Sequence, residues 1–148
     1  FCRFNDLISW LSKLQAMRKQ DPELENAYLY FRLLDEQLFP SSAKLDNLIT
    51  IAQEHHRNYG NHYTQISLAL AHLRNDDPSQ ALVSLGNPQN WRKWASQRPA
   101  WAFIASQIYK MNHDSEKASI LQQQIDFAQM DKAERESLQK LFPSSDDE

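Results

Sequence analysis

The stretches Asn75–Ala81 (NDDPSQA) and Asn112–Ala118 (NHDSEKA) decide the fold, because they describe the same local event twice, 37 residues apart. Each follows an apolar stretch with helical spacing, carries Asn and Asp where that helix should end, and places Ala early in the next segment. We interpret each as a helix, a short turn and a second helix. A period of about 20 to 50 residues is typical of stacked helix pairs, which bury their apolar faces against one another.

Apolar residues recur at helical spacing along almost the whole sequence, and no convincing alternation of a β-strand appears. Two glycines in 148 residues also disfavour strand-rich folds and phosphate-binding loops. We expect a single all-α domain, 1–148, of stacked antiparallel helix pairs. The expected helices are 5–19, 22–38, 42–58, 62–74, 78–85, one irregular or helical turn within 88–97, a helix from 99 through 109, 114–129, and a last short helix that ends near Phe142. Asp131 and Glu134 are expected to form a capping box for that last helix.

The residues around both turns resemble a tetratricopeptide (TPR) repeat. The segments that carry the resemblance are Ala69-Leu-Ala-His72 with Ala81-Leu82, and Ser106-Gln-Ile-Tyr109 with Ala118. The resemblance implies a TPR-like α-solenoid in which Ala69 and Ser106 are the small first-helix positions. It also implies that His72 and Tyr109 occupy the aromatic position, and that the two alanines lie where paired helices cross.

The clearest units span 62–87 and 99–128, and the sequence departs from the family in two ways. Asn75 and Asn112 stand where the family has glycine, and residues 88–98 add length between the units. Such repeats bind peptides, unfolded segments or partner helices. The layout is also similar to that of small chaperones of bacterial type III secretion subunits.

Aromatic and cationic side chains are concentrated between residues 91 and 110. The candidate partner-binding residues are Trp91, Arg92, Lys93, Trp94, Arg98, Trp101, Tyr109 and Lys110. Aromatic rings beside cations can clamp an anionic peptide or stack on bases, although tryptophans at helical spacing also serve as core. The net charge of −3 disfavours nucleic acid. We expect at least one of these tryptophans, Trp91 or Trp94, to be partly exposed and to contact a partner.

No pattern in the sequence indicates a catalytic reaction. His55, His56 and His62 could supply imidazoles to a metal, but their spacing matches no helix-borne site, and we expect surface or turn histidines, no metal and no cofactor. The single cysteine, Cys2, excludes an internal disulfide. No serine lies in a G-x-S-x-G motif.

These observations favour a non-enzymatic protein–protein interaction module, a scaffold, adaptor or chaperone that binds a protein or peptide segment in a concave groove. The alternatives are a self-associating homo-oligomer or a membrane-tethered accessory domain and, in a different class, an enzyme or metal protein that uses the histidines. No apolar run is long enough to span a bilayer. Because the sequence starts at Phe1 rather than Met, we expect an upstream piece, and a signal or anchor there would place the domain outside the cytoplasm.

Overall fold

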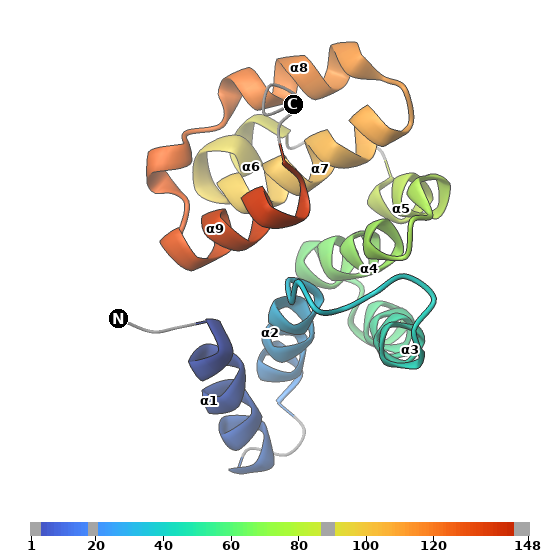
Figure 1. Ribbon diagram of the computed structural model, residues 1–148, viewed down its shortest axis with the longest axis vertical. Helices are drawn as coiled ribbons and strands as arrows, with labels where there is room; N and C mark the ends of the chain where they lie inside the picture. Colours follow the sequence, from blue (N-terminus) through green and yellow to red (C-terminus); the bar gives the residue numbers. More distant parts are fainter. Residues whose placement is uncertain (1–3, 18–20, 87–90, 144–148) are drawn as a thin grey trace.

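A computed structural model describes residues 4–17, 21–86 and 91–143, and within these ranges the regular secondary structure is entirely helical (Figure 1). The elements are α1 (Phe4–Met17), α2 (Pro22–Leu33), α3 (Ala43–Tyr59), α4 (His62–Arg74), α5 (Pro78–Leu85), α6 (Trp91–Gln97), α7 (Pro99–Met111), α8 (Ser115–Gln124), a 3-10 turn (Phe127–Gln129) and α9 (Lys132–Leu141). The prediction of an all-α fold is confirmed.

The two turns recognised in the sequence have the same geometry. Asp76 and His113 are left-handed, with φ of 54° and 65°, a conformation that commonly follows the end of a helix. Each turn is followed by an aspartate, Asp77 or Asp114, whose carboxylate accepts the N–H three residues later and caps the next helix. The backbone N–H of each aspartate also returns to a carbonyl five residues earlier, at 3.0 and 2.9 Å. The 37-residue period is therefore present in the hydrogen bonding as well as in the sequence.

The small residues assigned from the sequence are buried. Ala81 is fully buried and Ala118 is 4% exposed, while Ala69 and Ser106 on the preceding helices have no exposed surface. Small side chains at these points let α4 pack against α5, and α7 against α8. The expected burial of the two second-helix alanines is confirmed.

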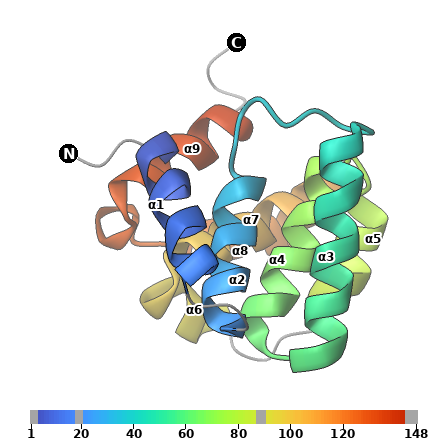
Figure 2. The same ribbon diagram turned by 90° about the horizontal axis from the view of Figure 1, so that it is seen from below.

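Further contacts join the helix pairs to one another. α2 packs against α3 and α4, and α4 packs against α7; Figure 2 shows α2 to α5 side by side, with α1 outside α2. The Asn75 Oδ1 atom accepts the Ser41 N–H at 2.8 Å. The Asn112 amide in turn donates to the Pro78 carbonyl at 2.8 Å. Each turn asparagine thus forms a hydrogen bond with an earlier part of the chain: Asn75 with the connection between α2 and α3, and Asn112 with the start of α5.

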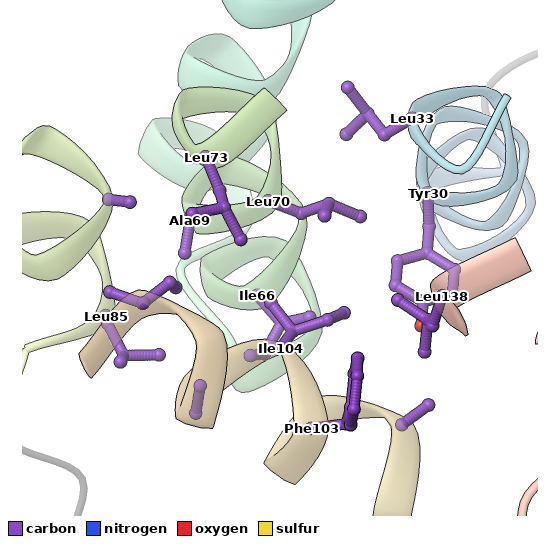
Figure 3. Packing of buried hydrophobic residues seen from close by; sticks show 14 of the residues in the cluster. Tyr30, Leu33, Ile66, Ala69, Leu70, Leu73, Leu85, Phe103, Ile104 and Leu138 are labelled. Carbon is purple, nitrogen blue, oxygen red and sulfur yellow. The ribbon is translucent and has the colours of Figure 1, made fainter. Parts of the chain in front are cut away.

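The core lies where α2, α4, α5 and α7 meet (Figure 3). Its fully buried members include Leu33 of α2, Ile66 and Leu70 of α4, Leu85 of α5 and Ile104 of α7. At their edge Leu138 of α9, which is 1% exposed, completes the core and fixes the last helix to the rest of the structure.

Two predicted helices end earlier than expected. α2 stops at Leu33 rather than residue 38, because the Arg74 guanidinium donates to the carbonyls of Leu33, Asp35 and Leu38 and so satisfies the groups that a longer helix would pair. α8 stops at Gln124 rather than residue 129, because Ile125 is extended (φ −78°, ψ 123°) and buried.

The capping box predicted for α9 forms only in part. The Asp131 carboxylate accepts the N–H groups of Ala133 and Glu134, as expected of a cap. The Glu134 carboxylate instead accepts the hydroxyl hydrogen of Tyr30 at 3.0 Å, because a buried tyrosine hydroxyl needs a partner.

Candidate binding pocket

A row of aromatic rings runs through the face where α2, α4, α6 and α7 meet. The Tyr30 and Tyr63 ring centroids are 5.9 Å apart, and Tyr63 stacks on Trp101 at 5.3 Å and 26°. Trp101 meets Trp94 edge-to-face at 5.6 Å, and Trp94 meets His62 in the same way at 5.6 Å. We call these five side chains the aromatic row. Tyr63 and Trp101 can stack because both lie in the first turns of neighbouring helices.

Three members of the aromatic row, Tyr30, Tyr63 and Trp101, line a pocket of about 220 Å³. The pocket is lined by Tyr30, Phe31, Tyr63, Gln97, Arg98, Pro99, Ala100, Trp101, Gln129, Met130, Asp131 and Glu134. The exposed Arg98 holds its guanidinium carbon 5.2 Å from the Trp101 ring centroid, a cation–π contact that keeps the charge beside the opening. A cation and a hydrogen-bonded carboxylate therefore share one aromatic pocket.

The pocket environment changes the proton affinity of its acids. Burial raises the pKa of Glu134, and the charge of Asp131 raises it further, while the Tyr30 hydrogen bond and the charge of Arg98 oppose the shift. Burial, with the nearby Glu134 charge, raises the pKa of Tyr63 to about 12. The same two causes raise the pKa of Tyr30 well above its ordinary value. Both phenols therefore stay neutral hydrogen-bond donors around pH 7.

A second pocket, of about 530 Å³, lies at the other ends of the same helices. It is lined by Pro40, Leu73, Arg74, Asp76, Gln107, Lys110, Met111, Leu141, Phe142 and Pro143. α9 occupies the space between the two pockets, since Glu134 near its start lines the first and Leu141 at its end lines the second. We call the surface that α2, α4 and α7 present to α9 the inner face.

The structure brings some of the predicted binding residues together and separates others. Arg98 and Trp101 line the first pocket, and Lys93 is exposed on α6. Tyr109 and Lys110 lie near the other end of α7, about 12 Å along the helix from Trp101 at 1.5 Å per residue. Tyr109 is buried, with the Lys117 ammonium 5.5 Å from its ring centroid, while Lys110 lines the second pocket.

Of the two tryptophans expected to include a partly exposed one, Trp91 and Trp94, the structure rules out Trp94. Trp94 is 4% exposed, because its ring packs between Trp101 and His62. The side chains of Trp91 and Arg92 lie outside the described residues. The aromatic surface that a partner can reach in the described part of this region is therefore Trp101, which is half-buried, rather than Trp94.

Of the residues that line the first pocket, only Arg98 and Trp101 were recognised from the sequence; those that were not include Tyr30, Tyr63 and Glu134. Tyr30 and Glu134 are separated by 104 positions, and nothing local connects them. The available signal was the aromatic density of residues 28–31, which also fits an ordinary core helix.

The histidines have separate polar partners. His55 Nε2 is 3.1 Å from Glu25 Oε2, His56 Nδ1 is 3.1 Å from Thr64 Oγ1, and His62 Nδ1 is 3.4 Å from Gln65 Oε1. The expectation of surface or turn positions is wrong for His55, which is 9% exposed. Among the described residues, no three His, Cys, Asp or Glu side chains group in a way that could hold a metal ion. In the same ranges no helix has the length and apolar character needed to cross a membrane.

Comparison with known proteins adds no identification: no protein-family model, no curated protein and no solved structure matches this chain.

Proposed function

We propose that this chain is a non-enzymatic protein–protein interaction module, a scaffold, adaptor or chaperone that binds a partner segment on the inner face. In this proposal α2–α3, α4–α5 and α7–α8 are the pairs of a TPR-like solenoid. The proposal is supported by the matched turns and by the contacts of α2 with α4 and of α4 with α7. Stacked pairs of this kind present their first helices as one continuous surface.

The observation that carries the proposal is the pocket with aromatic walls and an arginine at its opening. Tyr63 and Trp101 offer flat apolar surface, and Arg98 is exposed beside them. Aromatic and arginine side chains supply most of the energy in protein interfaces, where they accept an apolar anchor and orient a charge. The pocket therefore suits an apolar or aromatic partner side chain next to a carboxylate, which Arg98 would pair.

The two pockets also set the length of the bound segment. They lie at opposite ends of the inner face, and Trp101 and Lys110 are about 13 Å apart along α7. A partner that uses both must span about three helical turns or about five extended residues, allowing for its own side chains. This is the scale of a short linear motif.

The test is selection of random peptides on the purified chain by display, followed by affinity measurement by fluorescence anisotropy. Selected peptides should be enriched in an aromatic or aliphatic residue next to Asp or Glu. Arg98→Glu should weaken their binding about ten-fold or more, since it replaces an attraction by a repulsion at an exposed position. Trp101→Ala should also weaken binding, by removing the stacked pocket wall.

Two variants serve as matched controls for this test. Lys93→Glu makes the same charge change at an exposed residue of α6 outside both pockets, and Trp10→Ala removes a tryptophan that is 57% exposed on α1. Both should leave affinity unchanged. The proposal is refuted if no peptide is selected, or if Lys93→Glu and Arg98→Glu reduce affinity equally.

A further inference from the structure

α9 is seated on the inner face through one buried polar contact and a short apolar stripe. Near its start, Glu134 accepts the Tyr30 hydrogen bond; one turn later Leu138 is 1% exposed and lies close to Tyr30 (Figure 3). Leu141 packs against the core, and Phe142 follows with its ring centroid 6.5 Å from that of Phe103. The contacting positions are thus i, i+4 and i+7 of one helix face.

The contacts at the two ends of α9 fix its direction. Asp131 and Glu134 share the first pocket with Tyr63 and Trp101, from the first turns of α4 and α7. Leu141 shares the second pocket with residues from the last turns of the same helices. α9 therefore runs parallel to α4 and α7, along the path that we propose for a partner segment.

The ion pair between α9 and the segment after α2 is weak. The Lys140 ammonium lies 3.8 Å from a Glu36 carboxylate oxygen, and both side chains are more than half exposed, so water screens this pair. The segment that connects α8 to α9 is exposed at Asp126, Ala128 and Gln129, between the buried Ile125 and Met130. Release of α9 would therefore uncover Leu138 and its neighbours without requiring α2, α4 or α7 to unfold.

We propose that α9 is a tethered occupant of the inner face and that the natural partner is a helical segment which replaces it. That segment carries a carboxylate followed by leucine-like residues four and seven positions later, as Glu134, Leu138 and Leu141 do. Its carboxylate takes the Tyr30 hydroxyl and faces Arg98, and its leucines take the places of Leu138 and Leu141. This inference rests on the proposed function and specifies the partner.

The pockets explain how a partner outcompetes a helix that is covalently attached. A tether gives α9 a high effective concentration, on the order of millimolar for a short flexible connection, so a free helix must bind more tightly than α9 does. α9 forms part of the lining of both end pockets but does not fill them, and the walls that α4 and α7 contribute remain when α9 leaves. A partner helix that extends past both ends can place an apolar side chain in each pocket, and these contacts are ones that α9 does not make.

The experiment measures binding of a fluorescent peptide of residues 131–143 to the full chain. Leu138→Ala in the chain weakens the seating of its own α9, the tethered copy of this sequence. The peptide should then bind the variant at least about ten-fold more tightly than it binds the parent, because apparent affinity rises with the fraction of chains whose inner face is open. Glu134→Gln in the chain keeps the acceptor for Tyr30 and removes the buried charge. It should strengthen the tethered copy and weaken peptide binding. The matched control peptide carries Leu138→Asp and should not bind.

Hydrogen exchange of the parent chain gives a second measurement that needs no variant. Amides of α9 should exchange about ten-fold or more faster than the slowest amides of α7, because α9 opens on its own. Equal exchange in the two helices overturns the inference, as does equal peptide affinity for the parent, Leu138→Ala and Glu134→Gln chains. Light scattering that shows a dimer with exchanged α9 helices overturns it too, since a second copy is then the occupant. If display-selected peptides bind at Arg98 while the α9 peptide does not, this inference fails and the proposed function stands.

Discussion

Replacing Arg74 by leucine should be among the most destabilising single substitutions in this chain. Arg74 is buried at the end of α4, and its guanidinium donates to three backbone carbonyls at and after the end of α2: Leu33 and Asp35 through Nη1, and Leu38 through Nη2 at 2.6 Å. Burial lowers the pKa of Arg74, while the charges of Asp35 and Asp76 raise it. One side chain therefore terminates α2 and holds the connection to α3.

The expected loss of stability follows from the three carbonyl groups that lose their hydrogen-bond donor. A hydrogen bond to a charged group contributes about 1.5–3 kcal/mol, so three independent bonds would sum to about 4.5–9 kcal/mol. The bond to Asp35 is only part-buried and water can replace it, and the leucine regains some packing, so we expect Arg74→Leu to cost about 3–5 kcal/mol. Arg74→Lys keeps the charge but not the planar fork and should cost about 1–3 kcal/mol.

Urea denaturation followed by circular dichroism measures these losses, with Arg57→Leu, at an exposed position of α3, as the control. A loss below about 1 kcal/mol for Arg74→Leu would show that the three carbonyls find other partners, and the reasoning would be refuted.

Three further predictions use the same unfolding assay. Ala81→Leu and Ala118→Leu should each lower the free energy of unfolding by about 1–3 kcal/mol, because leucine overpacks the helix crossings. Unchanged urea midpoints would show that neither alanine lies at a helix crossing. Asn26→Leu should stabilise by about 1–3 kcal/mol, because both polar atoms of this 1% exposed amide lack a hydrogen-bond partner; a loss of stability would reveal a partner such as a bound water. Glu134→Gln should stabilise the chain near pH 7 and not at pH 4. Burial raises the folded pKa of Glu134 above its ordinary value of 4.5, so the parent loses stability as pH rises from 4.5 through the folded pKa; parallel pH profiles for the parent and variant would contradict this.

Local signals predicted the part of the fold that local chemistry determines. The bounds expected for α4 and α5, 62–74 and 78–85, are those of the structure. Asn61 caps α4 in a reciprocal pair of hydrogen bonds with Thr64, and Gly86 at φ 67° ends α5. Each of these signals lies within one turn of the boundary that it marks, so the sequence carries it without knowledge of the tertiary fold.

Helix ends that depend on distant residues were not predictable in this way. The periodicity of Leu24 to Leu38 continues past the true end of α2, and the side chain that ends the helix is Arg74, 41 positions from Leu33. Likewise, Ile125 and Ala128 continue the apolar spacing of α8, but the chain becomes extended at Ile125. In both cases tertiary contacts override a local pattern.

The sequence predicted some residues of the first pocket and missed others, again because tertiary contacts are not visible in a local pattern. Arg98 and Trp101 stood out because cations and tryptophans are dense in one short stretch, and both line the pocket. Glu134 was assigned to a capping box, since three residues separate it from Asp131. The backbone cap and the Tyr30 hydroxyl compete for this one carboxylate, and the tertiary contact forms because Tyr30 is buried and its hydroxyl needs a hydrogen-bond partner.

The chemistry of the inner face comes largely from residues outside the two repeated turns. The matched segments at 75–81 and 112–118 build the helix pairs and contribute mainly buried alanines and caps. Trp94 and Arg98 come from the insert between the units, and Glu134 comes from the helix after the last pair. If the chain is a binding module, substitutions in the turns should change stability without changing which peptide is chosen. Substitutions at the exposed Arg98 should change the choice of peptide at nearly constant stability, so the two sets of variants separate the contribution to folding from the contribution to recognition.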